Sequence, residues 1–403
     1  MSCRKLYLEN SDALCARALV VSCSQRKDGA YDIVTKCTPL FPEGGGQLSD
    51  TGEMNGHRIL HCREENGEVV HRVEAPFAVG DEVEIKVDGR TRRIHTQQHT
   101  GEHILSFAYA KLFGAENVGF HMNDEVVTID LDRMLTDEEI SLGEKYANDM
   151  VWNDNEVKIY TVTADEAAAL PLRKRNEKLS GDDIRIVEIG GGEMCTCCGT
   201  HFSSTAQVGM IKVIDHVRYK QGCRISFACG ELALKWFDIE NRELKRAAAH
   251  LSVKTDGVYD AVCRKDEQIA QLNAELKLAE DVIAAANADK LLNGAVRVND
   301  IKCVFGFVNT GFQAMKRTAE IICNDAKSMT VLFCKDNDRY RYICMSGSDC
   351  DINCKNVAMK INESMNAKGG GNPKTAQGSF FGCSEEDIAT FIEKLPELCG
   401  GMI

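Results

Sequence analysis

Residues 97–106 read QQHTGEHILS, and a second motif, CCGTH, begins at Cys197. The apolar spacing of the first stretch predicts a helix, on which His99 and His103, four residues apart, project from one face. Cys197 and His201 offer a thiolate and an imidazole at the same spacing. Three imidazoles and one thiolate are a ligand set that zinc prefers in tetrahedral geometry. The sequence therefore predicts one zinc ion per chain at this site.

Other ligand choices stay open at this point. His95 precedes His99 by four residues and competes with His103, while Cys195 or Cys198 could replace Cys197 as the sulfur ligand. A zinc-protease helix carries its general base directly after the first histidine, whereas Glu102 here stands directly before the second. Peptidase chemistry is therefore disfavoured.

The two motifs resemble the zinc site of the editing domain of alanyl-tRNA synthetases, in which HxxxH is followed later in the chain by CxxxH. Two further segments extend the resemblance. Residues 41–52, FPEGGGQLSDTG, resemble the GGQ loop that lines the substrate pocket of that domain. Residues 369–378, GGGNPKTAQG, are similar to a loop in the C-terminal domain of the same synthetases, which is shared with DHH-type phosphoesterases. The family's CGGTH is here CCGTH, because Cys198 replaces a glycine.

The resemblance implies a free-standing alanyl-tRNA editing protein of the long type, since Phe41 comes too early for an aminoacylation domain to precede it. Such a protein is a cytoplasmic, zinc-dependent hydrolase that deacylates mischarged Ser-tRNA(Ala) and Gly-tRNA(Ala). Gly45, Gly46 and Gln47 are then expected at the catalytic pocket, with Gln47 contacting the serine hydroxyl. In the alternative interpretation, Gln47 is a turn residue that satisfies backbone groups.

The expected partner is the acceptor end of tRNA(Ala). A net charge of −13 argues against indiscriminate nucleic-acid binding, so local basic patches would have to carry the contact. The expected tRNA-binding residues are Arg173, Lys174 and Arg175 in one run and Gly369, Gly370, Gly371 and Lys374 in the other, with Arg90, Arg92 and Arg93 as a further candidate patch. The alternatives are a solvated charged face and, for the glycine loop, a packing turn.

Composition fits a soluble protein of two or three domains, because 403 residues exceed what one core usually holds. No apolar run reaches the roughly 18 residues of a membrane span, so no membrane partner is expected. The 19 cysteines are odd in number and follow no signal peptide, which indicates reduced cytosolic thiols. A second class of function remains open, namely a non-catalytic tRNA-binding protein with a structural zinc.

The predicted fold class is α+β, in four segments. Residues 1–90 are expected to form a small β-barrel, and residues 91–228 a zinc-binding editing domain of mixed helices and strands. Residues 229–292 carry apolar positions at 3-4 spacing, which predicts a helical linker or coiled coil. Residues 293–403 are expected to form an α/β domain resembling the DHHA1 domain. A homodimer through the helical segment or the C-terminal domain is one expected assembly, and an amphipathic helix packed on its own domain is the alternative.

Overall fold

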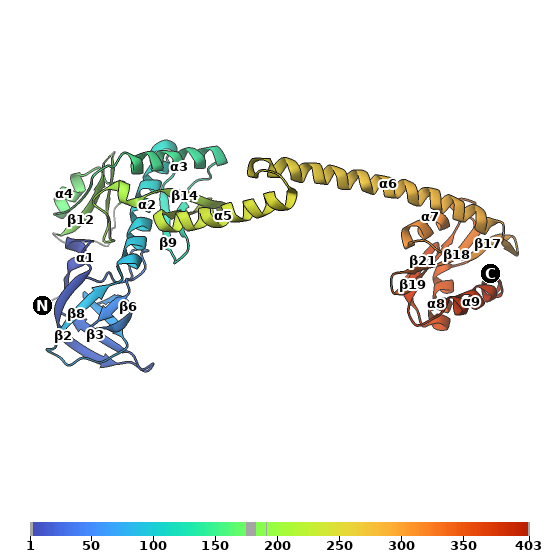
Figure 1. Cartoon of the computed structure of the whole chain (residues 1–403), viewed down its shortest axis with the longest axis horizontal. Helices are drawn as coiled ribbons and strands as arrows, with labels where there is room; N and C mark the ends of the chain where they lie inside the picture. Colours follow the sequence, from blue (N-terminus) through green and yellow to red (C-terminus); the bar gives the residue numbers. More distant parts are fainter. Residues whose placement is uncertain (1–2, 175–182, 191, 402–403) are drawn as a thin grey trace. The chain divides into compact units, whose positions relative to one another are not determined.

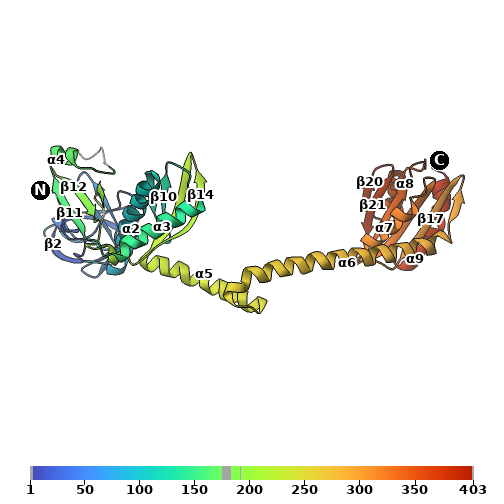
Figure 2. The same ribbon diagram turned by 90° about the horizontal axis from the view of Figure 1, so that it is seen from above.

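The computed structural model describes residues 3–174, 183–190 and 192–401, and it divides the chain into two compact units. We call residues 1–247 the N-terminal unit and residues 248–403 the C-terminal unit. Figures 1 and 2 label their helices and strands. No helix of the described residues is both long and apolar enough to cross a membrane.

A closed six-stranded barrel occupies the beginning of the N-terminal unit, within the range for which the sequence predicts one. Its strands, in the order β2-β3-β7-β6-β5-β8, are Cys15–Gln25, Tyr31–Thr35, Glu68–Val73, His57–Glu65, Gly52–Met54 and Glu82–Val87. In β8, buried Val83, Ile85 and Val87 alternate with exposed charged residues, as expected for a strand with one face in a barrel core. A short strand pair, β1 (Arg4–Lys5) with β4 (Cys37–Thr38), and helix α1 (Leu6–Glu9) lie at its edge.

The rest of the N-terminal unit is built around helix α2 (Gly89–Phe113). Asp88 caps its first turn by accepting from the backbone N–H groups of Arg90 and Thr91, and Gly114 ends it in the left-handed conformation. Residues 95–109 are all buried, polar residues included, in the helix that the sequence predicts. The polar side chains can be buried because tertiary partners surround α2 and supply hydrogen bonds to them.

Two antiparallel sheets and two helices accompany α2. The four-stranded sheet β14-β15-β10-β9 consists of Ile211–Tyr219, Gly222–Cys229, Val127–Leu131 and Asn117–Met122. The three-stranded sheet β11-β12-β13 consists of Val157–Val162, Ile184–Ile189 and Glu193–Thr196. The helices are α3 (Asp137–Trp152) and α4 (Ala164–Ala169), with a 3₁₀ turn at Thr205–Val208. Residues of α2, α3 and the four-stranded sheet share one apolar core.

A buried ion pair links α2 to the barrel. Arg92 is 3% exposed and Asp50 is 0% exposed, and Arg92 Nε donates to both carboxylate oxygens at 2.9 and 3.1 Å. The same guanidinium donates to the backbone carbonyls of Ser11 and Pro39, each at 2.6 Å. Since buried charges are retained only when paired and hydrogen-bonded, this cluster fixes the barrel relative to α2.

Two helices cover the range predicted as a linker or coiled coil, α5 (Gly230–Leu251) and α6 (Val258–Leu292), separated by a 3₁₀ turn at Thr255–Gly257. Near the end of α6, Ala284 and Ala288 are buried, and Leu291 and Leu292 pack against the core that helix α7 (Phe312–Ile322) shares. Farther back on α6, three of the apolar positions at 3-4 spacing, Ile269, Leu272 and Leu276, are 55–63% exposed. No coiled-coil pairing is therefore seen among the described residues.

The remaining chain forms a six-stranded sheet with helices on both faces. Its order is β16-β17-β18-β19-β21-β20, with bounds Val296–Val298, Ile301–Val308, Ser328–Asp336, Arg339–Ser346, Thr375–Phe380 and Lys368–Gly371. Along β18, Met329, Val331 and Phe333 face the core shared with α8 (Cys354–Met365) and α9 (Glu385–Gly400). Leu332 and Cys334 face α6 and α7 (Phe312–Ile322). Both faces of the sheet are covered, as in an α/β domain. Within this sheet only the β17–β18 pair is parallel, because the other connections include tight hairpins, which join antiparallel strands.

Candidate metal centre

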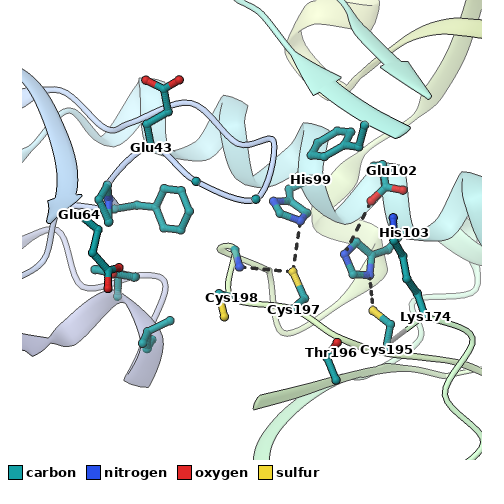
Figure 3. A pocket seen from close by; sticks show the side chains of 18 of the residues that line it. Glu43, Glu64, His99, Glu102, His103, Lys174, Cys195, Thr196, Cys197 and Cys198 are labelled. Carbon is teal, nitrogen blue, oxygen red and sulfur yellow. Dashed lines mark hydrogen bonds and ion pairs between the residues drawn. The ribbon is translucent and has the colours of Figure 1, made fainter. Parts of the chain in front are cut away.

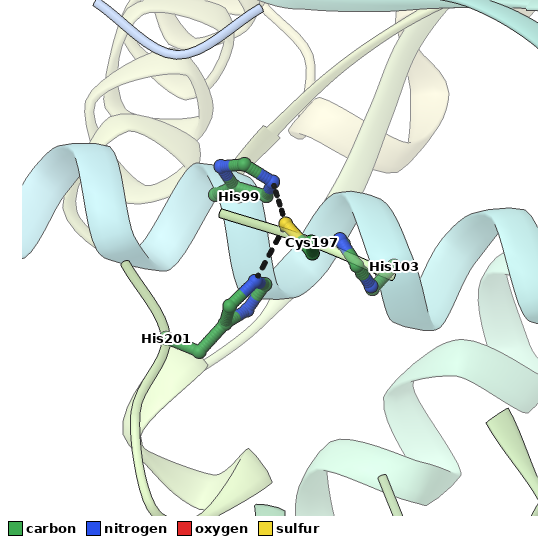
Figure 4. Close-up of side chains that lie close together, drawn as sticks. All are labelled: His99, His103, Cys197 and His201. Carbon is green, nitrogen blue, oxygen red and sulfur yellow. Dashed lines mark hydrogen bonds between the residues drawn. The ribbon is translucent and has the colours of Figure 1, made fainter. Parts of the chain in front are cut away.

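Four side chains from two distant segments converge beside α2. His99 and His103 come from successive turns of this helix, and Cys197 and His201 come from the loop that follows β13 (Figure 4). One nitrogen or sulfur atom of each lies within 4.8 Å of the corresponding atoms of the other three. The histidines are 2–5% exposed. The four ligands expected from the sequence are thus brought together in space.

Hydrogen bonds to the outer nitrogens orient two of these rings. His99 Nδ1 lies 2.7 Å from Gln47 Oε1, which can only accept, so His99 carries its proton there and turns Nε2 inward. His201 Nδ1 lies 3.3 Å from Thr100 Oγ1. The Nε2 atoms of both rings lie 3.3 Å from Cys197 Sγ.

The geometry and chemistry of these donors fit zinc. Usual Zn–N and Zn–S bond lengths in a tetrahedral site place nitrogen and sulfur about 3.6 Å apart, close to the observed separations. Burial lowers the pKa of both His99 and His103 to about 3, so both rings are neutral and offer lone pairs. Burial raises the pKa of the Cys197 thiol to about 12, which means that metal binding must displace its proton.

The alternative ligands lie in other environments. His95 is buried but is not part of the group, and its Nδ1 atom has no hydrogen-bond partner among the described residues. Cys198 is exposed and lines a pocket beside the metal centre, which is described below. Cys195 belongs to a second candidate group with His103 and Glu193, and its Sγ atom lies 3.1 Å from His103 Nδ1. Cys195 thus approaches His103, whereas Cys197 lies between His99 and His201.

A buried ion pair stands behind His103. Arg173 donates from Nε and Nη2 to the carboxylate of Glu193 at 2.7 and 2.6 Å, and Glu193 Oε1 lies 3.7 Å from His103 Nδ1. The charge of Arg173 is therefore matched by Glu193, which leaves it less free for the contact with tRNA that the sequence predicts. Arg173 and Lys174 both line the pocket described below. Arg175 lies outside the described residues.

A pocket of about 820 Å³ adjoins the metal centre (Figure 3). Barrel-side residues, including Tyr7, Phe41, Glu43 and Glu64, form one part of its wall. The other part is formed by His99, Glu102, His103, Phe120, Arg173, Lys174 and residues 195–199. Three of the candidate ligands, His99, His103 and Cys197, thus stand in the wall of a cavity large enough for a small-molecule group.

Glycines allow close packing between the 41–52 loop and the ligands. Gly45 lines the pocket, whereas Gly46 has a φ of +85° and lies against Phe120. A Cβ atom at Gly46 would come within 2.4 Å of the Phe120 ring, and one at Gly199 would come within 2.1 Å of His99 Cε1. Side chains at either position would therefore displace a ring of the site.

Gln47 does not line this pocket; it is 1% exposed and engaged on both ends of its amide. Oε1 accepts from the backbone N–H of Thr200 at 3.1 Å in addition to His99, and Nε2 donates to Thr200 Oγ1 at 3.0 Å. These contacts do not support its expected contact with the substrate hydroxyl. They hold His99, a candidate metal ligand, and the loop that carries Cys197 and His201.

The C-terminal glycine loop forms strand β20 and its hairpin with β21, in which Gly369 and Gly371 pack closely on β21. The ammonium group of Lys374 donates to three backbone carbonyls, those of Gly347, Ser348 and Cys350, at 2.7–3.1 Å. Lys374 is therefore a structural residue, which corrects its expected role in binding tRNA. Gly370 remains exposed at the edge of the sheet.

The candidate patch on α2 is neutralised only in part, because Arg90 and Arg93 share one carboxylate and remain exposed. Arg90 and Arg93 both pair with the carboxylate of Glu231, and Arg92 pairs with Asp50. These arginines hold the start of α2 to its neighbours.

Three residues around the centre were not expected from the sequence. In the sequence, the position of Glu102 argues only against a protease, and Glu193 belongs to no recognised motif. Arg185, on β12, donates from Nη1 to the carbonyls of Cys197 and Gly199 at 2.6 and 3.0 Å and so clamps the ligand loop. Its position, twelve residues before Cys197 in a β-type run, gave no signal of this contact.

Comparisons with known proteins agree with this geometry. Residues 184–226, which include Cys197 and His201, match the family described as "Threonyl and Alanyl tRNA synthetase second additional domain". The chain is 26% identical to alanyl-tRNA editing protein AlaX-L of Pyrococcus horikoshii, over 96% of both chains. It is 26% identical to the putative alanyl-tRNA editing protein alaX of Saccharomyces cerevisiae, over 94% of this chain and 93% of that one.

The alanine–tRNA ligase of Pyrococcus abyssi is 28% identical over 91% of this chain, but the chain spans only 41% of that ligase. Among solved structures, the C-Ala domain from Aquifex aeolicus alanyl-tRNA synthetase aligns with 27% of this chain and 98% of its own, at 16% identity. Its TM-score of 0.25 carries no weight for the fold. Along nearly its whole length, this chain is therefore similar to proteins named as alanyl-tRNA editing proteins, and it matches about two fifths of the length of an alanine–tRNA ligase.

Proposed function

We propose that this protein is a zinc-dependent trans-editing hydrolase that deacylates mischarged Ser-tRNA(Ala) and Gly-tRNA(Ala). The observation that carries the proposal is the convergence of His99, His103, Cys197 and His201 into one group, of which the first three line the 820 Å³ pocket. The relatives named as alanyl-tRNA editing proteins support the same assignment. Its partner would be the acceptor end of tRNA(Ala), encountered in the cytoplasm where tRNA is charged.

The reaction is hydrolysis of the ester that joins the amino acid to the terminal ribose. It requires an attacking water, a polarised carbonyl and donors for the developing oxyanion. Zinc, when bound, would supply either activation of water or a fixed positive charge that orients the ester. The chain's own contribution is to hold that ester in the pocket, between the glycine loop at Gly44 and Gly45 and the ligand loop at 197–199.

Selectivity for serine over alanine follows from the hydroxyl group. A site that hydrogen-bonds this hydroxyl leaves its own polar groups unpaired when alanine enters, so alanine is rejected. Because Gln47 does not line the pocket, we assign this recognition to the polar residues that do. Glycine differs from alanine by one methyl group, worth only about 1–3 kcal/mol in an apolar pocket, so its preference over alanine should be the smaller one.

Deacylation assays on three charged forms of tRNA(Ala) test the proposal. Ser-tRNA(Ala) should be hydrolysed fastest, Gly-tRNA(Ala) more slowly, and Ala-tRNA(Ala) largely spared. A chelator should abolish the activity, and added zinc should restore it. Equal rates on all three substrates would indicate a nonspecific esterase, which contradicts an editing role.

A second candidate function is a tRNA-binding protein with a structural zinc. Four protein ligands complete a tetrahedral shell, which is the usual arrangement of structural zinc sites. In that case, zinc-replete protein would bind tRNA(Ala) but hydrolyse none of the three esters. The same assays therefore decide between the two functions.

A further inference from the structure

Glu102 is a buried carboxylate at the pocket, held by one of its two oxygens. It lies on α2 directly before His103, and its side chain is 7% exposed. Oε1 accepts from Ser106 Oγ at 2.7 Å and from Asn117 Nδ2 at 2.6 Å. Asn117 also donates to Ser106 Oγ at 3.0 Å, so the three side chains form one rigid cluster. The carboxylate is therefore fixed in one orientation.

The second oxygen has no hydrogen bond. His103 Nε2 lies 3.7 Å from it, which is beyond hydrogen-bonding distance. No other donor to Oε2 is found within residues 3–174, 183–190 and 192–401. Glu102 lines the pocket beside His103, as Figure 3 shows. This oxygen can therefore accept a hydrogen bond from a cationic group bound in the pocket.

The protein's own cations near this pocket do not fill that role. Arg173 is bound to Glu193, and Lys5 is bound to Glu64 at 2.7 Å. Lys174 lines the pocket but forms no ion pair with Glu102 within 4.0 Å. His103 would be neutral as a metal ligand. Glu102 is also absent from both groups of candidate metal ligands. Its negative charge is thus available to a bound molecule.

We propose that Glu102 binds the α-ammonium group of the aminoacyl ester, so that the site selects substrates with a free amino group. This inference rests on the proposed function. The α-ammonium is separated from the ester carbonyl carbon by the α-carbon alone. Anchoring it at Glu102 would therefore hold the carbonyl beside the metal centre. Esters whose amino group is blocked or absent lack this contact and bind less tightly.

The test compares Ser-tRNA(Ala) with the same tRNA carrying the α-hydroxy counterpart of serine, in which a hydroxyl replaces the ammonium. Wild-type protein should favour the seryl ester. Glu102→Gln preserves the side-chain shape and an acceptor for Ser106 and Asn117 but removes the charge. A hydrogen bond to a charged group contributes enough that this variant should raise KM for the seryl ester by about tenfold to hundredfold. KM for the α-hydroxy ester should change little.

Glu64→Gln is the matched control, because Glu64 also lines the pocket but is already paired with Lys5. It should leave the ratio of the two KM values as in the wild type. Zinc content should remain unchanged in Glu102→Gln; its loss would assign Glu102 to the metal site and overturn the proposal. An equal fall of kcat on both esters would make Glu102 a group that acts on water, which also overturns it.

Failure of the proposed function gives a different result. If no ester is hydrolysed, binding of 3′-deoxy-3′-(serylamino)adenosine and of its α-hydroxy counterpart can be measured by calorimetry without turnover. Glu102→Gln should then weaken binding of the first compound only. Equal affinity of wild-type protein for both compounds would refute the role of Glu102, whatever the activity.

Discussion

Gln47→Ala should weaken zinc binding rather than change which amino acid is removed. The substitution deletes the acceptor that His99 Nδ1 reaches at 2.7 Å and both contacts to Thr200. The Nδ1 proton of His99 then lies buried without a partner, and the ring loses the restraint that turns Nε2 toward Cys197. The loop contact of Thr200 survives in part, because Thr96 Oγ1 lies 2.8 Å from Thr200 Oγ1.

The expected size of the effect follows from the loss of a ligand-orienting hydrogen bond. Removing such a partner typically lowers metal affinity by about 10- to 100-fold, or about 1.4–2.7 kcal/mol. Competition titration against a chromophoric zinc chelator measures this directly as a change in the zinc Kd. Gln47→Glu keeps an oxygen acceptor for His99 and should bind zinc more tightly than Gln47→Ala.

Gln98→Ala is the matched control for the loss of a buried amide. Gln98 neighbours His99 on α2 and makes two hydrogen bonds to the backbone of Cys229, at 2.8 and 2.9 Å, without touching a candidate ligand. Its loss should lower stability but leave the zinc Kd nearly unchanged. The proposed positioning role would be refuted if Gln47→Ala left the zinc Kd unaltered. In that case, the ratio of the rates on Ser-tRNA(Ala) and Ala-tRNA(Ala) would fall more than the ratio of the rates on Gly-tRNA(Ala) and Ala-tRNA(Ala). This pattern would restore Gln47 as the residue that contacts the serine hydroxyl.

Three further outcomes are expected. Metal analysis of the purified protein should find about one zinc per chain. His201→Ala should lose this zinc, and His95→Ala should keep it. If His95→Ala loses more zinc than His103→Ala, the ligands are misassigned. Asp50→Ala should lower the free energy of unfolding of the N-terminal unit by about 3–5 kcal/mol in urea titrations, because it leaves Arg92 buried and unpaired. The control variant Glu9→Ala removes an exposed partner of Arg4 and should change the free energy of unfolding little. Burial lowers the pKa of His71 to about 4, below its ordinary value near 6.5, so the folded protein holds this ring neutral. Protonation therefore favours the unfolded chain: the stability linked to neutral His71 is complete above pH 6.5 and is lost as the pH falls toward 4. That contribution amounts to about 3 kcal/mol, and His71→Gln should therefore flatten the fall of unfolding free energy between pH 6.5 and 4; an unchanged slope would contradict it.

Local patterns in the sequence predicted the parts of the site that depend on local geometry. The spacing of His99 and His103 places both rings on one face of a helix whatever the rest of the fold does. The alternating residues of Glu82–Val87 likewise predict a strand with one buried face. The mostly antiparallel C-terminal sheet was not predicted, because strand direction depends on connections such as the β18–β19 hairpin, which alternation of strands and helices does not specify.

The roles of individual polar residues could not be predicted, because each depends on partners far away in the chain. Gln47 binds Thr200, more than 150 residues later, and so serves the metal ligands rather than the pocket. The Oε2 atom of Glu102 is available because Ser106 and Asn117 occupy its other oxygen. A sequence shows which groups can donate or accept hydrogen bonds, but only the fold shows which of them are already satisfied.

The pairing of cations inside the fold likewise limits where RNA can bind. Nucleic-acid affinity comes from cations that are free to meet phosphates, and a net charge of −13 repels the backbone elsewhere. The basic residues of the candidate patches that the structure describes are Arg90, Arg92, Arg93, Arg173, Lys174 and Lys374. Within the described part of the chain, all of them except Lys174 have their charge engaged by a carboxylate or by backbone carbonyls. Because Lys174 lines the pocket, part of the electrostatic attraction offered by this set acts at the pocket itself, where the aminoacyl end of the tRNA would enter.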